Sequence, residues 1–256
     1  MLLQGKRIAI FNVANKRSIA WSIAKSMDAQ GASLILGYQN ERNKGTVEGL
    51  AEELVHEPLA ILPCDVAYPE QIEELQESLK DKADTIHGLV HSLAFAPREA
   101  LQHAYLFTER EQFLTALEIS VYSLVALARA LTPVFSSQAS ISTLTYYGSE
   151  KVMPNYNVMG VAKAALEASV RYLAHDLGTA GVRVNAISAG PINTVSARGV
   201  SGFLDILKVH EQRAPLGRTV EGREVGDTAV FLASDLASGI TGEVIYVDTG
   251  YNIMGF

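Results

Sequence analysis

Short apolar runs of strand length alternate along this chain with longer segments that carry a helical pattern. Parallel strands need long crossovers, usually helices, and strands covered on both faces read as continuous apolar runs. The alternation therefore predicts an α/β protein with a seven-stranded parallel sheet in a doubly wound, Rossmann-like fold. The expected strands are Arg7–Phe11, Ser33–Gly37, Ala60–Pro63, Gly88–His91, Ser140–Leu144, Arg183–Ile187 and Val244–Val247.

No composition shift marks an internal linker, and 256 residues are enough for one large core, so we expect a single domain over residues 1–256. The segment of about 190–216 follows the sixth expected strand and carries a helical pattern around Phe203 to Glu211. Because open α/β sheets bind ligands at the carboxyl ends of their strands, this loop and helix insertion is predicted to be a substrate-binding lid. The alternative is a plain surface excursion.

The charge balance and the cysteine count exclude several classes of function. A net charge of -7 and a pI near 5.4 argue against nucleic acid as a partner, since phosphate neutralisation needs clustered Lys and Arg. The single cysteine, Cys64, allows no internal disulfide, and no Cys or His cluster has metal-ligand spacing. The amino terminus has no long apolar stretch, so we expect a cytoplasmic protein without a membrane segment.

Two expected helices carry more apolar residues than one core-facing side requires. These segments are Phe113 to Leu131, which is apolar almost all round, and Tyr156 to Leu177. A helix of this kind must be covered on a second side. The pattern predicts that the pair packs against the same pair of another subunit, and the alternative is one unusually buried helix in a monomer.

The loop after the first strand has the features of an anion site but lacks the usual glycine-rich fingerprint. No glycine stands between Gly5 and Gly31. Ser18 can cap the following helix, whose free N–H groups and positive dipole end would face a pyrophosphate. Asn12 can replace a turn glycine because asparagine visits left-handed backbone conformations readily.

The next two strand ends also bear on a dinucleotide. A dinucleotide fold usually has an acid for the adenosine ribose at the end of the second strand, and here Gln39 stands there instead. Gln39 could bond a ribose edge and so favour NADH, whereas Arg42 and Lys44 could accept the 2′-phosphate of NADPH. Asp65 and Val66, after the third strand, could contact the adenine.

The strongest chemical signal is Tyr146 followed by Tyr156 and Lys163. Seven residues make two helical turns, so Tyr156 and Lys163 are expected on one helix face about 10 Å apart along the axis. A phenol is protonated at neutral pH and can donate to a developing oxyanion, and a nearby ammonium strengthens that field and can hold ribose hydroxyls. The alternative is that either tyrosine is an amphipathic core residue with a wet tip.

These residues resemble the divergent short-chain reductases that are enoyl-acyl-carrier-protein reductases of bacterial type II fatty-acid synthesis. Ordinary short-chain dehydrogenases of ketones and alcohols place the Tyr and Lys one turn apart, but position 160 here is Gly. The resemblance spans most of the chain through Asn15 to Ala20, Tyr38 to Asn40, Cys64 to Val66, His91 to Pro97, Tyr156-x6-Lys163, Ser188 to Ile192 and Gly242 to Val244.

The resemblance implies hydride transfer from NADH to the β-carbon of a trans-2-enoyl thioester, with Tyr156 holding the enolate oxygen. It also implies an acyl-carrier protein as the substrate's carrier and a homotetramer. Ala96 and Tyr146 would contact the acyl side, while Lys163 would hold the nicotinamide ribose. The remaining cofactor contacts implied are Asn12, Ser18, Ile19, Gln39, Asp65, Val66, Leu93, Ile192, Asn193, Thr194, Val195 and Ser196.

The chain departs from that family's pattern in three places. Asn12 and Thr249 stand where the family has glycines, and the lid helix offers mainly Lys208, flanked by Arg198 and Arg213, to an acidic carrier protein. Two other functions stay open beside enoyl reduction: a carbonyl-reducing short-chain dehydrogenase and a non-catalytic NAD-binding protein. The Tyr-x6-Lys spacing opposes the first of these, and the presence of both Tyr156 and Lys163 opposes the second.

Overall fold

The sheet is fully parallel and has the strand order β3-β2-β1-β4-β5-β6-β7 in the computed structural model, which describes residues 1–255. This architecture confirms the predicted doubly wound α/β fold. The order reverses between β1 and β4, so the crevice where such folds bind ligands lies at their carboxyl ends. The strands are β1 (Arg7–Phe11), β2 (Ser33–Tyr38), β3 (Ala60–Pro63), β4 (Ile86–His91), β5 (Phe135–Thr145), β6 (Arg183–Ala189) and β7 (Val244–Val247).

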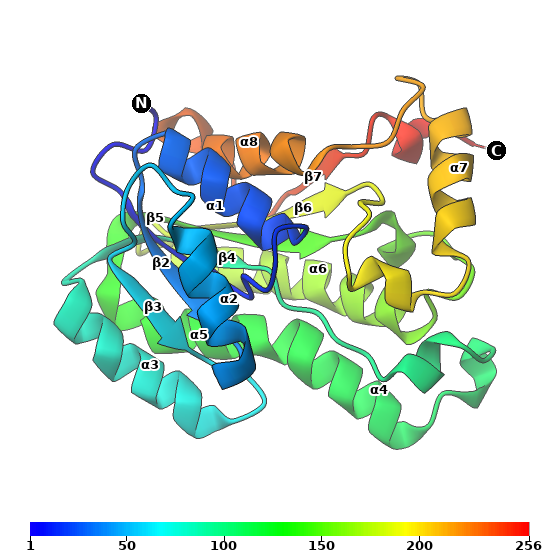
Figure 1. Cartoon of the computed structure of the whole chain (residues 1–256), viewed down its shortest axis with the longest axis horizontal. Coiled ribbons are helices and arrows are strands. Elements are labelled where there is room, and N and C mark those ends of the chain that lie inside the picture. Colours follow the sequence, from blue (N-terminus) through cyan, green and yellow to red (C-terminus); the bar gives the residue numbers. More distant parts are fainter. Residues whose placement is uncertain (256) are drawn as a thin grey trace.

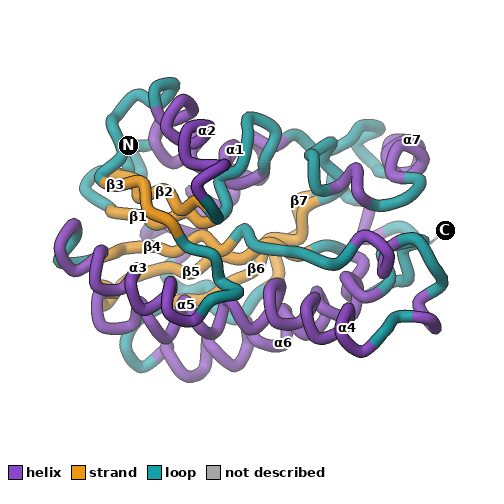
Figure 2. The backbone as a smooth tube through the Cα atoms, turned by 60° about the horizontal axis from the view of Figure 1, so that its bottom comes forward, coloured by secondary structure: helices purple, strands orange, loops and turns teal. Residues whose placement is uncertain are grey.

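Helices cover both faces of the sheet, and one helix stands apart from the layers (Figures 1 and 2). The helices are α1 (Ile19–Ala29), α2 (Glu41–Ala51), α3 (Pro69–Lys82), α4 (Arg110–Leu117), α5 (Ser123–Leu131), α6 (Val158–Gly178), α7 (Phe203–Arg213) and α8 (Gly222–Ala233). Helices α1, α2 and α8 lie on one face, and α3, α5 and α6 lie on the other. Helix α7 lies beyond the carboxyl ends of the strands, near the carboxyl terminus of the chain (Figure 1).

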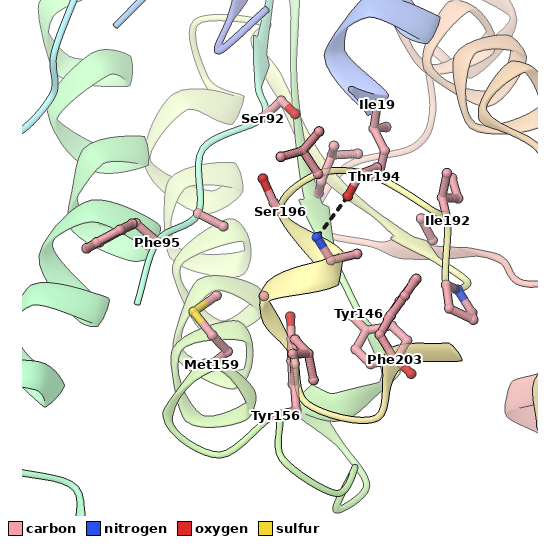
Figure 3. A pocket seen from close by; sticks show the side chains of 18 of the residues that line it. Ile19, Ser92, Phe95, Tyr146, Tyr156, Met159, Ile192, Thr194, Ser196 and Phe203 are labelled. Carbon is pink, nitrogen blue, oxygen red and sulfur yellow. Dashed lines mark hydrogen bonds between the residues drawn. The ribbon is translucent and has the colours of Figure 1, made fainter. Parts of the chain in front are cut away.

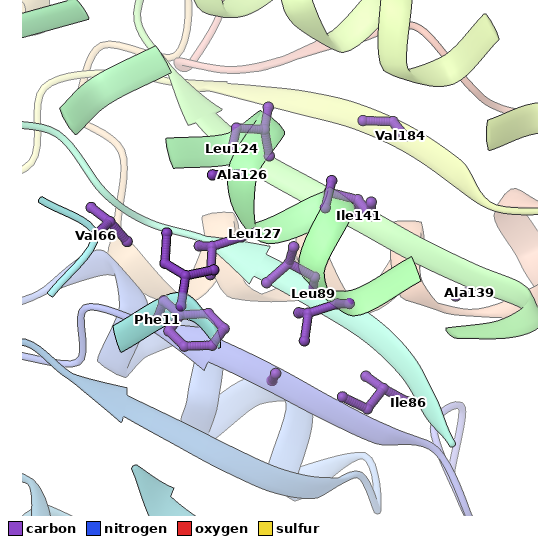
Figure 4. Packing of buried hydrophobic residues seen from close by; sticks show 14 of the residues in the cluster. Phe11, Val66, Ile86, Leu89, Leu124, Ala126, Leu127, Ala139, Ile141 and Val184 are labelled. Carbon is purple, nitrogen blue, oxygen red and sulfur yellow. The ribbon is translucent and has the colours of Figure 1, made fainter. Parts of the chain in front are cut away.

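The core follows the alternation of side chains along the strands. In β1, Ile8 and Ile10 pack with α1 and α8, whereas Ala9 and Phe11 pack on the opposite face with α3 and α5 (Figure 4). Successive strand side chains point to opposite faces, so one continuous apolar run supplies both layers. Gly37 of the neighbouring strand leaves the space that the Phe11 ring occupies.

The apolar helical stretch predicted around Phe113–Leu131 runs from Arg110 to Val134 and is interrupted by a π-helical turn at Glu118–Tyr122. By length and composition this stretch would suit a membrane span, yet half of its most apolar window is buried against the rest of the chain. Leu124 and Leu127 lie in the core beneath the sheet (Figure 4). The other side of the stretch stays uncovered in a single chain.

Thr249, at a position where the resemblance implies a glycine, has a positive φ of 58°. Its hydroxyl donates to the carbonyl of Arg218 at 2.9 Å and lies 3.0 Å from Nε2 of His210 on α7. The His210 ring is stacked on Tyr251 with a centroid separation of 4.7 Å. These contacts join the lid helix to the carboxyl-terminal segment, and they give the unusual threonine a structural role.

Candidate active site

A cavity of about 550 Å³ opens at the carboxyl ends of β1, β4, β5 and β6 and is covered by the lid around α7 (Figure 3). This volume lies in the usual range for small-molecule sites. The cavity brings together most of the site residues proposed from the sequence. They are Asn12, Ser18, Ile19, Leu93, Ala96, Tyr146, Tyr156, Lys163, Ile192, Thr194, Val195 and Ser196.

Four of the proposed cofactor residues lie outside the lining of this cavity: Gln39, Asp65, Val66 and Asn193. Gln39 donates from Nε2 to Oδ2 of Asp65 at 3.1 Å, so the ends of β2 and β3 are joined at the same sheet edge. Asn193 accepts from Nε of Arg198 at 2.8 Å. The first three residues therefore lie at the carboxyl ends of β2 and β3, outside the cavity lining, while the side chain of Asn193 is hydrogen-bonded within the lid.

The loop after β1 forms the tight turn that the sequence predicted. Asn12 has φ 69°, and its side-chain amide donates to the carbonyl of Ser92 at 2.8 Å. Ser18 caps α1, since its hydroxyl accepts from the amide of Trp21 at 3.1 Å. Both expectations for this loop's conformation are confirmed. The positive end of α1 consequently faces the cavity, where an anionic diphosphate is favoured.

Tyr146 and Tyr156 meet edge to face, with ring centroids 5.1 Å apart and an interplanar angle of 80° (Figure 3). Burial raises the pKa of both phenols well above the usual value for tyrosine, so both stay protonated at neutral pH. Gly148 makes room for the Tyr156 ring, because a Cβ at position 148 would lie 2.6 Å from its Cδ1. The pair thus presents hydroxyl donors in an apolar setting.

The predicted helix starting at Tyr156 is wrong at its first two residues. Helix α6 begins at Val158, and Asn157 before it has φ 44°, outside the helical region. Two full helical turns therefore do not separate Tyr156 from Lys163. The two side chains nevertheless line the same cavity, because the turn at Asn157 brings Tyr156 over the amino-terminal end of α6.

The glycine at position 160, where a one-turn Tyr–Lys spacing would need a lysine, has a packing reason. A Cβ at this position would lie 2.7 Å from the carbonyl oxygen of Gly148, in the turn at Tyr147–Ser149 on which the Tyr156 ring packs. A side chain here cannot be accommodated unless that turn shifts. The first turn of α6 therefore has no room for a lysine.

Replacing Gly160 with alanine is expected to destabilise the fold by about 1 to 3 kcal/mol, the usual cost of overpacking, although alanine is the better helix former. Chemical denaturation followed by circular dichroism measures the change. The matched control is Gly178→Ala at the other end of α6, where a Cβ would meet nothing within 4 Å. Equal stabilities of the two variants would contradict the close approach of Gly160 to Gly148.

Lys163 is almost fully buried and donates from Nζ to the carbonyl of Leu144 at 2.7 Å. Burial lowers the pKa of its ammonium to about 8, and the charge of Glu167 one turn further along α6 acts in the opposite direction. Within residues 1–255, Leu144 is the one hydrogen-bond acceptor of Nζ. An ammonium has three donors, so two remain for a ligand in the cavity.

Two buried polar residues, Glu167 and His91, interact electrostatically with Lys163. Glu167 accepts a hydrogen bond from the hydroxyl of Thr145 at 2.6 Å, at the end of β5. His91 lies between the hydroxyls of Thr143, 2.8 Å from Nδ1, and Ser123, 2.7 Å from Nε2. Burial and the charge of Lys163 lower the pKa of His91 to about 3, so the imidazole is neutral and adds no positive charge beside the ammonium.

The residues fit a dinucleotide with reduced nicotinamide at one end. A helix terminus can hold its diphosphate, an ammonium with two unused donors can hold ribose hydroxyls, and the phenols line the same cavity as that ammonium. Cys64 takes no part in this chemistry. Burial raises the pKa of its thiol to about 12, which agrees with its interpretation as a small buried apolar residue.

The sequence reasoning missed much of the apolar wall of the cavity. Met153 and Met159 stand three residues on either side of Tyr156, Leu101 comes from the loop before α4, and Phe203 and Ile206 come from the lid helix. The spacing around Tyr156 was a usable signal for the two methionines. Leu101 has none in the local pattern, because its place in the wall depends on how a distant loop packs.

Comparisons with known proteins agree with this geometry. The model of the family described as enoyl-(acyl carrier protein) reductase matches residues 13–252. The chain is 54% identical over 254 residues to the NADH-dependent enoyl-acyl-carrier-protein reductase FabI of Bacillus cereus, with 99% of each chain covered. It is 46% identical over 255 residues to the Aquifex aeolicus protein of the same name, covering 99% of this chain and 94% of the other.

Solved structures are similar over the full length. The Bacillus cereus enoyl-acyl-carrier-protein reductase with NADP+ and indole naphthyridinone has a TM-score of 0.97 at 54% identity, covering 100% of this chain and 99% of that one. The corresponding reductase of Anaplasma phagocytophilum in complex with NAD has a TM-score of 0.95 at 44% identity, covering 100% and 97%. Identities of this size make the shared fold secure and the shared site worth testing residue by residue.

Proposed function

The chain belongs to the enoyl-acyl-carrier-protein reductase family, and we propose that it reduces trans-2-enoyl thioesters with NADH to the saturated acyl thioesters of fatty-acid elongation. One arrangement supports this activity most strongly. A protonated phenol at Tyr156 and an ammonium at Lys163 line one apolar cavity, and the adjoining glycine at position 160 excludes the one-turn Tyr–Lys arrangement of carbonyl reductases.

Tyr156 carries the central role in this proposal. When bound, the reduced nicotinamide would supply the hydride that the β-carbon of the enoyl group accepts, and a proton taken up from solvent at the α-carbon would complete the saturated thioester. The Tyr156 hydroxyl donates a hydrogen bond to the thioester oxygen as negative charge develops there, and its raised pKa keeps the proton on the phenol. Tyr146 packs edge to face on this ring and holds its orientation, and Tyr146 and Ala96, which line the same cavity, are proposed to contact the acyl chain.

The other proposed roles divide along the cavity. Lys163 holds the nicotinamide ribose with its two unused donors, and Ser18 and Ile19 place the α1 terminus under the diphosphate. Asn12, Leu93 and the lid residues Ile192 and Thr194 to Ser196 enclose the dinucleotide. At the adenosine end, Asp65 and Val66 would contact the adenine beside the bonded Gln39, and Asn193 takes a supporting place in the lid.

The coenzyme proposed is NADH, as in the relatives' names. Gln39 offers an amide edge for a ribose hydroxyl, while the nearby Lys44 pairs with Glu41 of its own helix at 3.9 Å. Arg42 is exposed at the start of α2. A side-by-side affinity measurement with NADH and NADPH decides between them, and tighter binding of NADPH would contradict the proposed preference.

The affinity for NADH is expected to fall as the pH rises through about 8. The Lys163 ammonium is charged below its pKa of about 8 and neutral above it, so the charge-assisted bonds to the ribose are lost on the alkaline side. The raised pKa of Tyr156 excludes the phenol as the titrating group. Fluorescence titration of NADH across this range measures the effect, and Lys163→Arg, which stays charged, is expected to flatten it.

A homotetramer is proposed because apolar side chains on α4, on the π-helical turn that follows it and on α6 are uncovered in the single chain. Leu114, Tyr122 and Tyr172 are exposed there, on the two helices whose composition exceeded the needs of one core. Sedimentation at micromolar concentration tests this assembly, and a monomer would contradict it. We also propose a cytoplasmic location and a single domain over residues 1–256 with the lid at about 190–216.

We propose that the acyl-carrier protein docks at the lid and that electrostatic attraction contributes little to the affinity of this docking. On α7, Lys208 lies 3.7 Å from Asp205, and both side chains are exposed. Arg198 already donates to Asn193. Exposed pairs of this kind contribute little, so removing Lys208 should leave the KM for an acyl-carrier-linked substrate within about twofold.

The fate of the hydride tests the proposed reaction. NADH deuterated at its hydride position is expected to place deuterium on the β-carbon of the saturated product, as mass spectrometry and NMR can show. This outcome follows from the proposed role of Tyr156, because a phenol that stabilises charge on the thioester oxygen favours hydride addition at the β-carbon. Deuterium on the carbinol carbon of an alcohol, formed when a ketone is the substrate, would instead identify a carbonyl reductase.

A further inference from the structure

The two asparagines that flank Tyr156 both have a positive φ, which is 64° at Asn155 and 44° at Asn157. A residue with a side chain adopts such a conformation at a cost and keeps it where its surroundings hold it. Asn157 occupies the N-cap position of α6, yet its side chain makes no cap hydrogen bond to the helix. Both amide side chains are used elsewhere.

The amide of Asn157 holds the loop between β4 and α4. Its Nδ2 donates to the carbonyl of Ala100 at 3.1 Å and to that of His103 at 2.7 Å, which uses both of its hydrogens. The same loop contributes Arg98 and Leu101 to the cavity lining. Because Asn157 directly follows Tyr156 in the chain, these two hydrogen bonds tie this wall of the cavity to the backbone beside Tyr156.

The amide of Asn155 holds the lid on the other side. Its Nδ2 donates to the carbonyl of Ser201 at 2.9 Å, between the cavity-lining residues Val200 and Phe203. The following Gly202 also has a positive φ, of 75°, and begins the lid helix α7. In Figure 1 the amino-terminal end of α6 lies between this lid and the loop that precedes α4.

We propose that Asn155 and Asn157 form an asparagine clamp, which holds the lid and the loop at residues 100–103 in place on either side of Tyr156. Resting on the proposed function, the clamp sets how a long acyl chain lies relative to the phenol. Neither asparagine lines the large cavity, so both are positioning residues and not catalytic ones.

Asparagine suits both positions for two reasons that no other residue combines. It tolerates positive φ better than most residues with a side chain, and its amide supplies donors to backbone carbonyls. Aspartate shares the shape and the φ tolerance but can only accept. Glycine shares the backbone freedom but has no side chain, so these two replacements remove the donors in different ways.

The test compares Asn157→Asp and Asn157→Gly with the unsubstituted chain. Both variants are expected to speed amide hydrogen exchange in the segment 100–108, and to raise KM for a long-chain enoyl thioester about tenfold, the size expected for losing two neutral hydrogen bonds. The kcat for a short butenoyl thioester and the Kd for NADH should stay within about twofold, because Lys163 and the α1 terminus are untouched.

The matched control is the neighbouring position. Asn155→Asp and Asn155→Gly are expected to speed exchange in the lid segment 198–204 and to leave 100–108 as it is in the unsubstituted chain. Each variant should thus speed exchange only in the segment that its own asparagine holds. A general loss of stability would instead speed exchange in both segments in all four variants, and that result would overturn the clamp.

Two further outcomes would also overturn the clamp. One is unchanged exchange at 100–108 in both Asn157 variants, and the other is a KM that rises equally for short and long thioesters. If the unsubstituted chain reduced no enoyl thioester, the proposed function would fail instead. In that case, faster exchange restricted to the segment that each asparagine contacts would still show that the clamp holds the lid and the loop.

Discussion

Replacing Tyr156 with phenylalanine is expected to lower kcat for an enoyl thioester by about a hundredfold to a thousandfold, the loss measured when one oxyanion donor is removed. The ring and its edge-to-face contact with Tyr146 at 5.1 Å are kept, so the fold is preserved. Only the hydroxyl that meets the developing charge disappears. Steady-state kinetics with NADH and a short enoyl thioester measure the change.

Two further variants show whether the effect belongs to this hydroxyl. Tyr68→Phe, at an exposed tyrosine before α3, should leave kcat unchanged. Tyr146→Phe should act mainly on the KM for the thioester, because the proposed role of this phenol is to contact the acyl chain. A Tyr156→Phe variant with full kcat would show that another group stabilises the oxyanion.

Replacing Lys163 with methionine is expected to weaken NADH binding by about tenfold to a hundredfold, since hydrogen bonds from a charged donor contribute more than neutral ones. Methionine fills a similar volume, so the packing of α6 on β5 should be retained. The substitution also removes the bond from Nζ to the carbonyl of Leu144. Isothermal titration of the free enzyme with NADH measures the affinity directly.

The surface variant Lys80→Met serves as the control for this experiment. Lys80 lies on α3 and pairs with Glu77 at 2.7 Å, with both side chains exposed to solvent. Its loss should leave the Kd for NADH unchanged. If Lys163→Met bound NADH as tightly as the unsubstituted chain, Lys163 would not hold the nicotinamide ribose.

The strands were predictable because their signal is local. The bounds expected for Arg7–Phe11, Ala60–Pro63 and Val244–Val247 are those observed. Strand β5 was expected from Ser140 but begins at Phe135, because its first residues include exposed Ser and Gln that carry no apolar pattern. Runs of buried apolar residues reveal a parallel strand, whereas a partly exposed strand end does not.

The site was predictable where chemistry and local conformation coincide. Ser18 as a cap and Asn12 as a left-handed turn residue could be read from side-chain type alone. The start of α6 could not, because the positive φ of Asn157 is held by carbonyls more than fifty residues away. Leu101 and Phe203 enter the cavity through the same kind of distant packing, which no local period encodes.

Consumption of NADH, followed by absorbance with an enoyl thioester and separately with a β-keto thioester of the same length, tests the central claim most directly. We expect the enoyl compound to be the substrate, because Tyr156 and Lys163 line one cavity. The residue at position 160, between them in sequence, is a glycine packed closely on Gly148. Rapid oxidation of NADH with the enoyl thioester and none with the keto thioester is the predicted result. Turnover of the keto thioester alone would contradict it.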